Sequence, residues 1–145
     1  MALDGWTNTA TAGDRVWEKR SFSGNGYAEI NAFEDTNPET EAWLITPEIN
    51  TTMTDLFSFS SSMAFFRHTG LEVLYTDNYT GDPTSTSWDT VNVNLASESD
   101  GDHNWVSSGD VDLAPLGSSI HIAFKYTGTS SANTTTFRLD DITIR

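Results

Sequence analysis

Apolar and polar residues alternate over short runs of this chain, and this two-residue period restricts the possible folds more than any other feature. Residues 120–126 (IHIAFKY) are the clearest case, because every second side chain is apolar. No stretch of about twelve or more residues has the 3.6-residue apolar period of an amphipathic helix. The pattern predicts strands. The other predicted strands are 27–33, 43–49, 55–60, 71–76, 91–95 and 137–144.

Turn-forming sequences separate the predicted strands, for example SGNG at 23–26 and GTSSAN at 128–133. Many short strands joined by such turns are typical of a β-sandwich or β-barrel. A length of 145 residues fits one domain, so we expect residues 1–145 to form a single β-sandwich. The sequence shows no signal peptide and no transmembrane run, and we expect a module cut from a larger secreted protein.

The charge of the chain limits its partners. It has 21 acidic and seven basic residues, a formal net charge of −14. Nucleic acid, anionic membrane surfaces and acidic polymers are poor partners, since binding phosphate or other anions needs a basic surface. A neutral ligand or a cation fits better, although negative charge also simply keeps a secreted protein soluble. The absence of cysteine excludes disulfides, thiolate catalysis and cysteine-based zinc sites.

A set of motifs resembles a known group of domains. The motifs are GW at 5–6, WLITPEI at 43–49, LEVLYTDNYTG at 71–81, Trp88, WVSSGDVDL at 105–113, IHIAFKYTG at 120–128 and FRLDDITI at 137–144. Together they resemble the choice-of-anchor J and cleaved-adhesin domains of secreted Bacteroidota proteins. The resemblance implies a jelly-roll β-sandwich of two antiparallel sheets, similar to MAM-like domains and calcium-containing carbohydrate-binding modules. It also implies a non-catalytic role beside an attached enzyme, outside the cell or on its surface.

The last predicted strand carries two adjacent acids where its alternation changes phase. Phe137 and Leu139 are apolar before Asp140-Asp141, and Ile142 and Ile144 after it. This phase change predicts a β-bulge that turns one carboxylate inward, where it needs a cation or hydrogen-bond donors. The alternative is a solvated or arginine-paired acid pair at the end of a strand.

Calcium binding follows from the resemblance. In similar domains an aspartate of the terminal pair helps to hold a structural calcium ion, together with an acid before the WLITP-like strand. Glu41 occupies that second position, and Asp35 lies in the loop before it. Calcium needs six to eight oxygen ligands. The predicted metal ligands are Asp141, Asp140, Glu41 and Asp35.

Aromatic side chains in polar surroundings are the candidates for ligand binding. Sugars present C–H faces that stack on flat rings, and their hydroxyls bond to neighbouring polar side chains. Trp17 lies between charges in DRVWEKR, and Tyr79 lies in the loop DNYTGDP. The alternative is that such rings belong to the core, as we expect for Trp43, Phe57, Phe59, Phe124, Tyr126 and Phe137. The predicted carbohydrate contacts are Trp17, Tyr79, Phe66, Arg67, His68, Trp6 and Trp88.

No catalytic signature accompanies these residues. The chain lacks a nucleophile-elbow Gly-x-Ser-x-Gly motif, and no local carboxylate pattern indicates a glycosidase. The sequence therefore predicts a non-catalytic module that holds an attached enzyme at a polysaccharide. The charge favours a neutral glycan, such as a laminarin-type β-glucan. The alternative is a protein-binding adhesion or spacer module of a secreted or surface protein.

Overall fold

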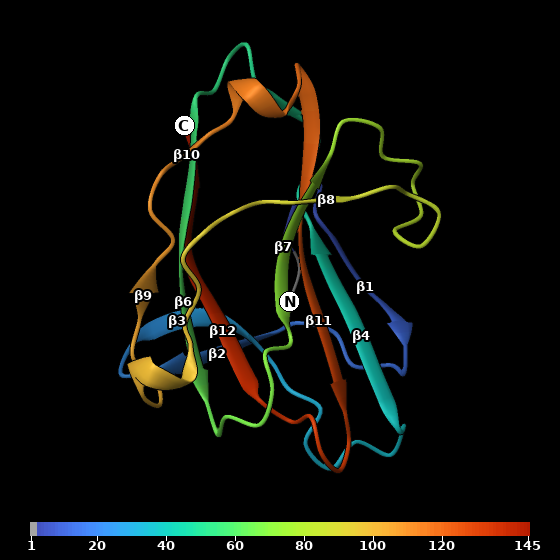
Figure 1. The fold of residues 1–145 in the computed structure, drawn as a ribbon, viewed down its shortest axis with the longest axis vertical. Coiled ribbons are helices and arrows are strands. Elements are labelled where there is room, and N and C mark those ends of the chain that lie inside the picture. Colours follow the sequence, from blue (N-terminus) through green and yellow to red (C-terminus); the bar gives the residue numbers. More distant parts are fainter. Residues whose placement is uncertain (1–2) are drawn as a thin grey trace.

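The computed structural model describes residues 3–145 and consists of two antiparallel sheets packed face to face (Figure 1). Sheet A has the strand order β1 (Thr7–Ala12), β4 (Glu39–Ile45), β11 (Ser119–Thr129), β7 (Leu71–Thr76) and β8 (Asp89–Thr90), with β5 (Ile49–Asn50) beside β11. Sheet B has the order β10 (Val111–Asp112), β6 (Leu56–Ala64), β12 (Thr136–Ile144), β3 (Asn25–Ile30) and β2 (Glu18–Phe22), with β9 (Val106–Ser107) beside β6. This arrangement confirms the predicted β-sandwich.

The core between the sheets is built from the alternating strands. Phe57 and Phe59 of β6 meet Phe124 of β11, and the rings of Phe59 and Phe124 lie edge to face with centroids 5.0 Å apart. Tyr126 is also fully buried, and its hydroxyl donates a hydrogen bond to the Thr135 carbonyl at 2.8 Å. The period of two in residues 120–126 therefore places its apolar side chains in the core, as predicted.

A second, smaller hydrophobic cluster covers the outer face of sheet A. Trp43, Ile45, Leu74 and Ala123 are buried there, and Tyr79 and Trp88 pack over them from the loop between β7 and β8. Because this loop shields the outer face, β4 is buried on both sides. The prediction that Trp43 is buried is confirmed, but its ring belongs to this outer cluster.

The segment 91–95 was wrongly predicted as a strand. Its backbone crosses from one sheet to the other: the Val91 amide donates to Val73 of sheet A, and the Ala96 amide donates to the Ser61 hydroxyl of sheet B. The alternation of Val91, Val93 and Leu95 reflects packing against the core during this crossing. Strands β1 (TNTATA) and β2 (EKRSF) were not predicted because neither has large apolar side chains at alternate positions.

The predicted β-bulge is present in β12. Asp140 pairs with Ser60 of β6 and Thr143 pairs with Ser58, so three steps along β12 match two along β6. Asp141 takes up the difference with a left-handed backbone, φ 53°. The bulge does not turn a carboxylate inward as expected, because Asp141 is exposed and half-buried Asp140 accepts a hydrogen bond from the Asp141 amide.

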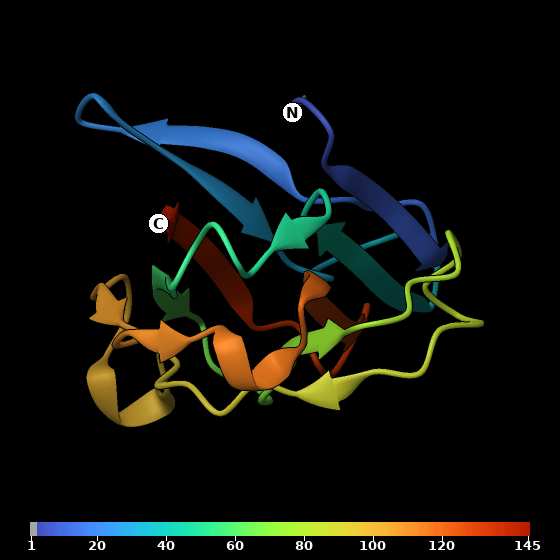
Figure 2. The same cartoon turned by 90° about the horizontal axis from the view of Figure 1, so that it is seen from above.

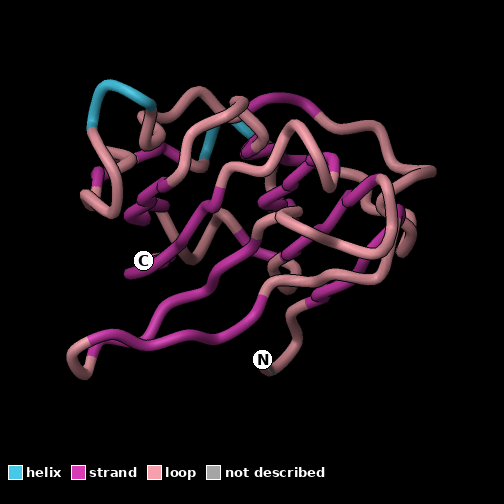
Figure 3. The backbone as a smooth tube through the Cα atoms, turned by 90° about the horizontal axis from the view of Figure 1, so that it is seen from below, coloured by secondary structure: helices cyan, strands magenta, loops and turns pink. Residues whose placement is uncertain are grey.

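The hairpin of β2 and β3 projects from the body of the sandwich at the edge of sheet B (Figures 2 and 3). Ser23 and Gly24 form its turn with positive φ angles of 50° and 83°. Phe22 precedes the turn and is 73% exposed. No helix within residues 3–145 has the length and apolar character that crossing a membrane requires.

Candidate functional site

The outer face of sheet B carries a row of polar and aromatic side chains. Because the core takes Ala28, Ile30 and Leu139, the alternate residues of β3 and β12 point outward. Strand register places Glu29 opposite Glu18 on β2 and opposite Arg138 on β12. The outer face of these strands is therefore charged in its centre, although the chain as a whole shows no basic patch in sequence.

A hollow of about 580 Å³ lies at the tip of the β2–β3 hairpin, and we call it the tip hollow. Its floor is Tyr27, over whose ring the Arg138 guanidinium is stacked at 4.6 Å. Trp105 meets Tyr27 edge to face at 5.8 Å. Trp105 and Phe22 thus offer exposed ring surface on the walls of the hollow. The tip hollow is lined by Phe22, Ser23, Asn25, Tyr27, His103, Trp105 and Arg138.

A second hollow of about 340 Å³ lies toward the base of the hairpin, and we call it the base hollow. Arg15 donates hydrogen bonds to the Asn31 carbonyl at 3.1 Å and to the Asn31 side-chain oxygen at 2.9 Å. That same oxygen accepts a bond from the Phe33 amide. These contacts fix Phe33 beside the hollow, where its ring is exposed. The base hollow is lined by Arg15, Val16, Glu18, Arg20, Glu29, Ile30, Asn31 and Phe33.

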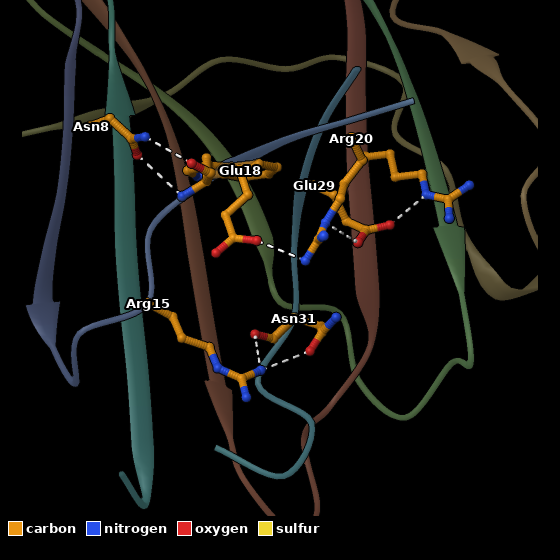
Figure 4. A network of polar contacts seen from close by, with 8 residues as sticks. Asn8, Arg15, Glu18, Arg20, Glu29 and Asn31 are labelled. Atoms are coloured by element: carbon orange, nitrogen blue, oxygen red, sulfur yellow. Dashed lines mark hydrogen bonds and ion pairs between the residues drawn. The ribbon is translucent and has the colours of Figure 1, made fainter. Parts of the chain in front are cut away.

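A network of ion pairs lies where the two hollows meet, and Figure 4 shows its members Glu18, Arg20 and Glu29. Arg138 Nε lies 2.8 Å from Glu29, and Arg20 bridges Glu29 at 3.6 Å and Glu18 at 2.8 Å. The Arg20–Glu18 pair is exposed and adds little to stability, whereas Glu29 and Arg138 are only 16% and 20% exposed. The effect of the network is to hold guanidinium donors and carboxylate acceptors in fixed positions on an open surface, where a hydroxyl-rich ligand can use both.

Three of the four exposed aromatic rings within residues 3–145 line these hollows. Phe22 and Trp105 line the tip hollow, and Phe33 lines the base hollow. The fourth, Phe65, lines neither hollow, and its ring lies edge to face with His103 at 5.8 Å. Three of the seven basic residues, Arg15, Arg20 and Arg138, line the two hollows. This surface is therefore aromatic and close to neutral on a strongly acidic protein.

Trp17 was wrongly predicted as an exposed sugar contact. Its side chain is fully buried in the core, and its backbone is held by the Asn8 side chain, which donates to the Trp17 carbonyl and accepts from its amide. The neighbouring charges misled the prediction, because Glu18 and Arg20 face outward while Trp17 faces inward. Trp17 Nε1 has no hydrogen-bond partner among residues 3–145.

The other predicted carbohydrate contacts are scattered. Trp6 is half-buried and packs against the core at the open edge between the sheets. Phe66 also packs against the core, whereas Arg67 is exposed. His68 is tied by both ring nitrogens, Nε2 to the Thr127 carbonyl at 2.6 Å and Nδ1 to the Thr135 hydroxyl at 3.1 Å. We therefore assign His68 a structural role. The three consecutive predicted contacts, Phe66, Arg67 and His68, do not form one site.

Tyr79 and Trp88 are brought together, with ring centroids 5.9 Å apart, on the outer face of sheet A. Trp88 lies 5.5 Å from Trp43, and its Nε1 donates to the Pro83 carbonyl. Burial, with a smaller contribution from Asp82, raises the pKa of the Tyr79 hydroxyl. These rings close the outer cluster of sheet A, and none of the hollows of the sheet B face includes them.

His121 packs against this cluster through Tyr79, and we expect it to make stability depend on pH. Its ring packs on Tyr79 at 4.8 Å, and burial lowers its pKa, which the nearby Glu48 only partly offsets. The unfolded chain, with a histidine pKa of about 6.5, takes up this proton at higher pH than the folded one. The free energy of unfolding must therefore fall as the pH drops through about 6.5 toward the lower folded pKa. We expect the urea midpoint to decrease between about pH 7.5 and 5.

The variant His121→Gln isolates this contribution from that of the other two histidines. It removes the titrating ring, so its urea midpoint should change less over the same pH range. An identical pH dependence in both proteins would contradict the assignment.

The four predicted metal ligands do not form one site. The Asp35 carboxylate lies 3.5 Å from Arg15 Nε and accepts hydrogen bonds from Thr40 and from the Asn37 amide. Burial raises the pKa of Asp35, but these partners outweigh it and hold the pKa below its ordinary value. The carboxylate is thus paired with a cation of the protein itself.

Glu41 and the aspartate pair lie on different sheets. Glu41 is on β4 of sheet A, where it pairs with Lys125 at 3.3 Å and accepts a bond from Thr11. Asp140 and Asp141 are on the bulge of sheet B. Within residues 3–145 no group of three or more acidic or histidine side chains could hold a metal ion. Calcium binding stays a prediction, and the residues proposed for it do not fit a shared ion.

Four residues of the candidate site were not predicted from the sequence: Phe22, Tyr27, Trp105 and Arg138. Two signals were present: Arg138 alternates with core residues of β12, which places it on the outer face, and Trp105 follows the polar turn at 97–104. Their meeting depends on a long-range pairing, because β12 joins β3 to β6. No local pattern brings residues 27, 105 and 138 together.

Comparison with solved structures shows the same fold in proteins of low sequence identity. The K1 cleaved adhesin domain of Lys-gingipain from Porphyromonas gingivalis W83 has a TM-score of 0.65 at 16% identity, covering 99% of this chain and 92% of that one. The K3 cleaved adhesin domain of the same protein has a TM-score of 0.63 at 13% identity, with the same coverage.

A carbohydrate-binding module also shares the fold. The structure of TmCBM61 in complex with β-1,4-galactotriose has a TM-score of 0.55 at 11% identity and covers 98% of this chain and 88% of that one. No protein-family profile matches the sequence, and a search of curated proteins found no match. At identities this low, the structural similarity establishes the fold alone. The chain shares its fold with the cleaved adhesin domains and with this module.

Proposed function

We propose that this protein is a non-catalytic carbohydrate-binding module and that its site is the outer face of sheet B. The observation that carries the proposal is the gathering of three of the four exposed aromatic rings of residues 3–145 at the two hollows. Trp105 and Phe22 offer faces on which sugar C–H groups stack. Arg138, Glu29 and Asn25 supply donors and acceptors for hydroxyls beside those rings.

The charge distribution favours a neutral glycan. The chain carries −14, and its field repels anions approaching from solution. The hollows themselves have three positive and two negative side chains, so they have no large excess of charge that would select an ionic ligand. A laminarin-type β-glucan fits this requirement. A β-1,4-galactan is a second candidate, since TmCBM61, which shares the fold, was crystallised with β-1,4-galactotriose.

The proposed setting is a secreted protein in which the module is joined to a catalytic domain. In that setting the affinity of the module itself can be modest, because binding raises the effective concentration of the attached enzyme at its polysaccharide. The cleaved adhesin domains with this fold are parts of a larger protein, Lys-gingipain, and this supports the proposed setting.

Affinity gel electrophoresis of the whole chain tests the proposal. The gels contain laminarin, β-1,4-galactan or xylan as neutral polysaccharides, and alginate or polygalacturonate as anionic ones. We expect at least one neutral polysaccharide to retard the protein while the anionic ones leave its mobility unchanged. Retardation should vanish when free oligosaccharide of the same linkage is added.

Two outcomes would contradict the proposal. If no polysaccharide retards the protein, the adhesion or spacer function becomes the better explanation of this fold. If only the anionic polysaccharides retard it, the arginines of the two hollows act as an anion site and the neutral ligand is wrong.

A further inference from the structure

The hollows of the sheet B face continue in one direction. The tip hollow begins at Asn25 and the base hollow ends at Asn31, so together they follow β3 from end to end. At about 3.3 Å per residue, the six residues of β3 span roughly 20 Å. Glu29 and Arg138 join the two hollows in the middle, where Arg138 lines one and Glu29 lines the other.

A third hollow extends this line beyond the strand. It has a volume of about 690 Å³, shares Phe33 with the base hollow, and is also lined by Arg67 and Ser130. We call it the loop hollow. Phe33 is 57% exposed and therefore stands at the junction with a free ring face. The Arg67 guanidinium has no carboxylate partner among the described residues, so its donors remain open to a ligand.

The ring positions show how a ligand would lie. Phe22 and Trp105 stand at one end of this line, the ion pairs of Glu29 with Arg20 and Arg138 lie in its centre, and Phe33 stands toward the other end. Stacking surfaces at separate points with a polar stretch between them suit a ligand that alternates between C–H faces and hydroxyls along its length. A single sugar unit could contact only one of these ends.

Resting on the function proposed above, we infer that the site binds an extended linear glycan of several sugar units along β3, with Phe33 as a distinct remote contact. The tip hollow binds the first units through Trp105 and Phe22. The base and loop hollows bind the units that follow, and Phe33 stacks on one of them. Affinity therefore rises with ligand length until the glycan reaches Phe33.

Calorimetric titration with a length series tests this inference. The probes are laminari-oligosaccharides and β-1,4-galacto-oligosaccharides, each from the disaccharide to the octasaccharide. We expect affinity in the series that binds to increase beyond the trisaccharide. Phe33→Ala should lower the affinity for the longest ligand about tenfold and leave that for the shortest binding ligand unchanged, because the shortest does not reach residue 33.

Phe65→Ala is the matched control. Phe65 is an exposed phenylalanine of the same type, 67% exposed, which contacts His103 but lines none of the three hollows. Its removal should leave the length dependence intact. Phe22→Ala, in contrast, should weaken binding of all lengths by a similar factor, because it acts on the end where every ligand binds.

The outcomes separate this inference from the proposed function. If affinity stops rising at the trisaccharide, or if Phe33→Ala behaves as Phe65→Ala does, the extended mode is wrong while a carbohydrate site at the tip hollow stands. If neither series nor any polysaccharide binds, the proposed function itself fails, and the inference fails with it.

Discussion

Trp17→Ala is expected to destabilise the domain by about 3–5 kcal/mol, the range for removing a buried tryptophan or phenylalanine side chain. The ring is fully buried in the main core. Its Nε1 has no hydrogen-bond partner among the described residues 3–145, so the loss comes from packing and apolar burial and not from a broken hydrogen bond. Single domains are commonly stable by only about 5–15 kcal/mol, and the variant should lose a large part of this margin. Urea denaturation followed by circular dichroism measures the loss.

The variant Trp17→Phe provides the comparison. It retains an aromatic ring in the same position and should lose much less stability than the alanine variant. Because Trp17 lines none of the hollows of the sheet B face, the folded phenylalanine variant should bind glycan as the unchanged protein does. A folded Trp17→Ala protein of normal stability with weakened glycan binding would instead restore Trp17 as a sugar contact.

The strands and the bulge were predicted correctly, whereas the position of Trp17 was not. This difference shows which properties the local sequence determines. The alternation in residues 120–126 predicts β11 because strand geometry assigns successive side chains to opposite faces. The phase change at Asp140 predicts the bulge of β12 for the same reason. In both cases the relevant physics acts between residues a few positions apart, and the prediction is correct.

The site depends on contacts that local sequence does not determine. Trp17 and Trp105 both lie in polar sequence, yet Asn8 holds one in the core, while the other extends from a loop to Tyr27. Asp35 was expected to bind calcium, but Arg15, distant in sequence, already neutralises it. Polar neighbours in sequence reveal that a loop is solvated and do not reveal which face a ring occupies.

Trp105→Ala is expected to reduce glycan affinity by about thirtyfold or more, which corresponds to roughly 2 kcal/mol and is typical of a tryptophan at the centre of an interface. Trp105 is 40% exposed and stands over Tyr27 on the wall of the tip hollow. Removing its ring deletes stacking surface that every bound glycan uses. It leaves the main core intact, so the urea midpoint should change little. Calorimetry and urea denaturation of the same preparation measure both quantities.

Trp88→Ala is the converse experiment, because Trp88 was predicted from the sequence as a carbohydrate contact and lies on the opposite sheet. Its ring packs against Trp43 and Tyr79 and closes the outer cluster of sheet A. The variant should lose about 1–3 kcal/mol of stability and retain its affinity for glycan. If Trp88→Ala loses binding and Trp105→Ala does not, the site lies on sheet A. If both lose binding without unfolding, each face of the sandwich carries a glycan site, and the hollows of sheet B account for only one of them.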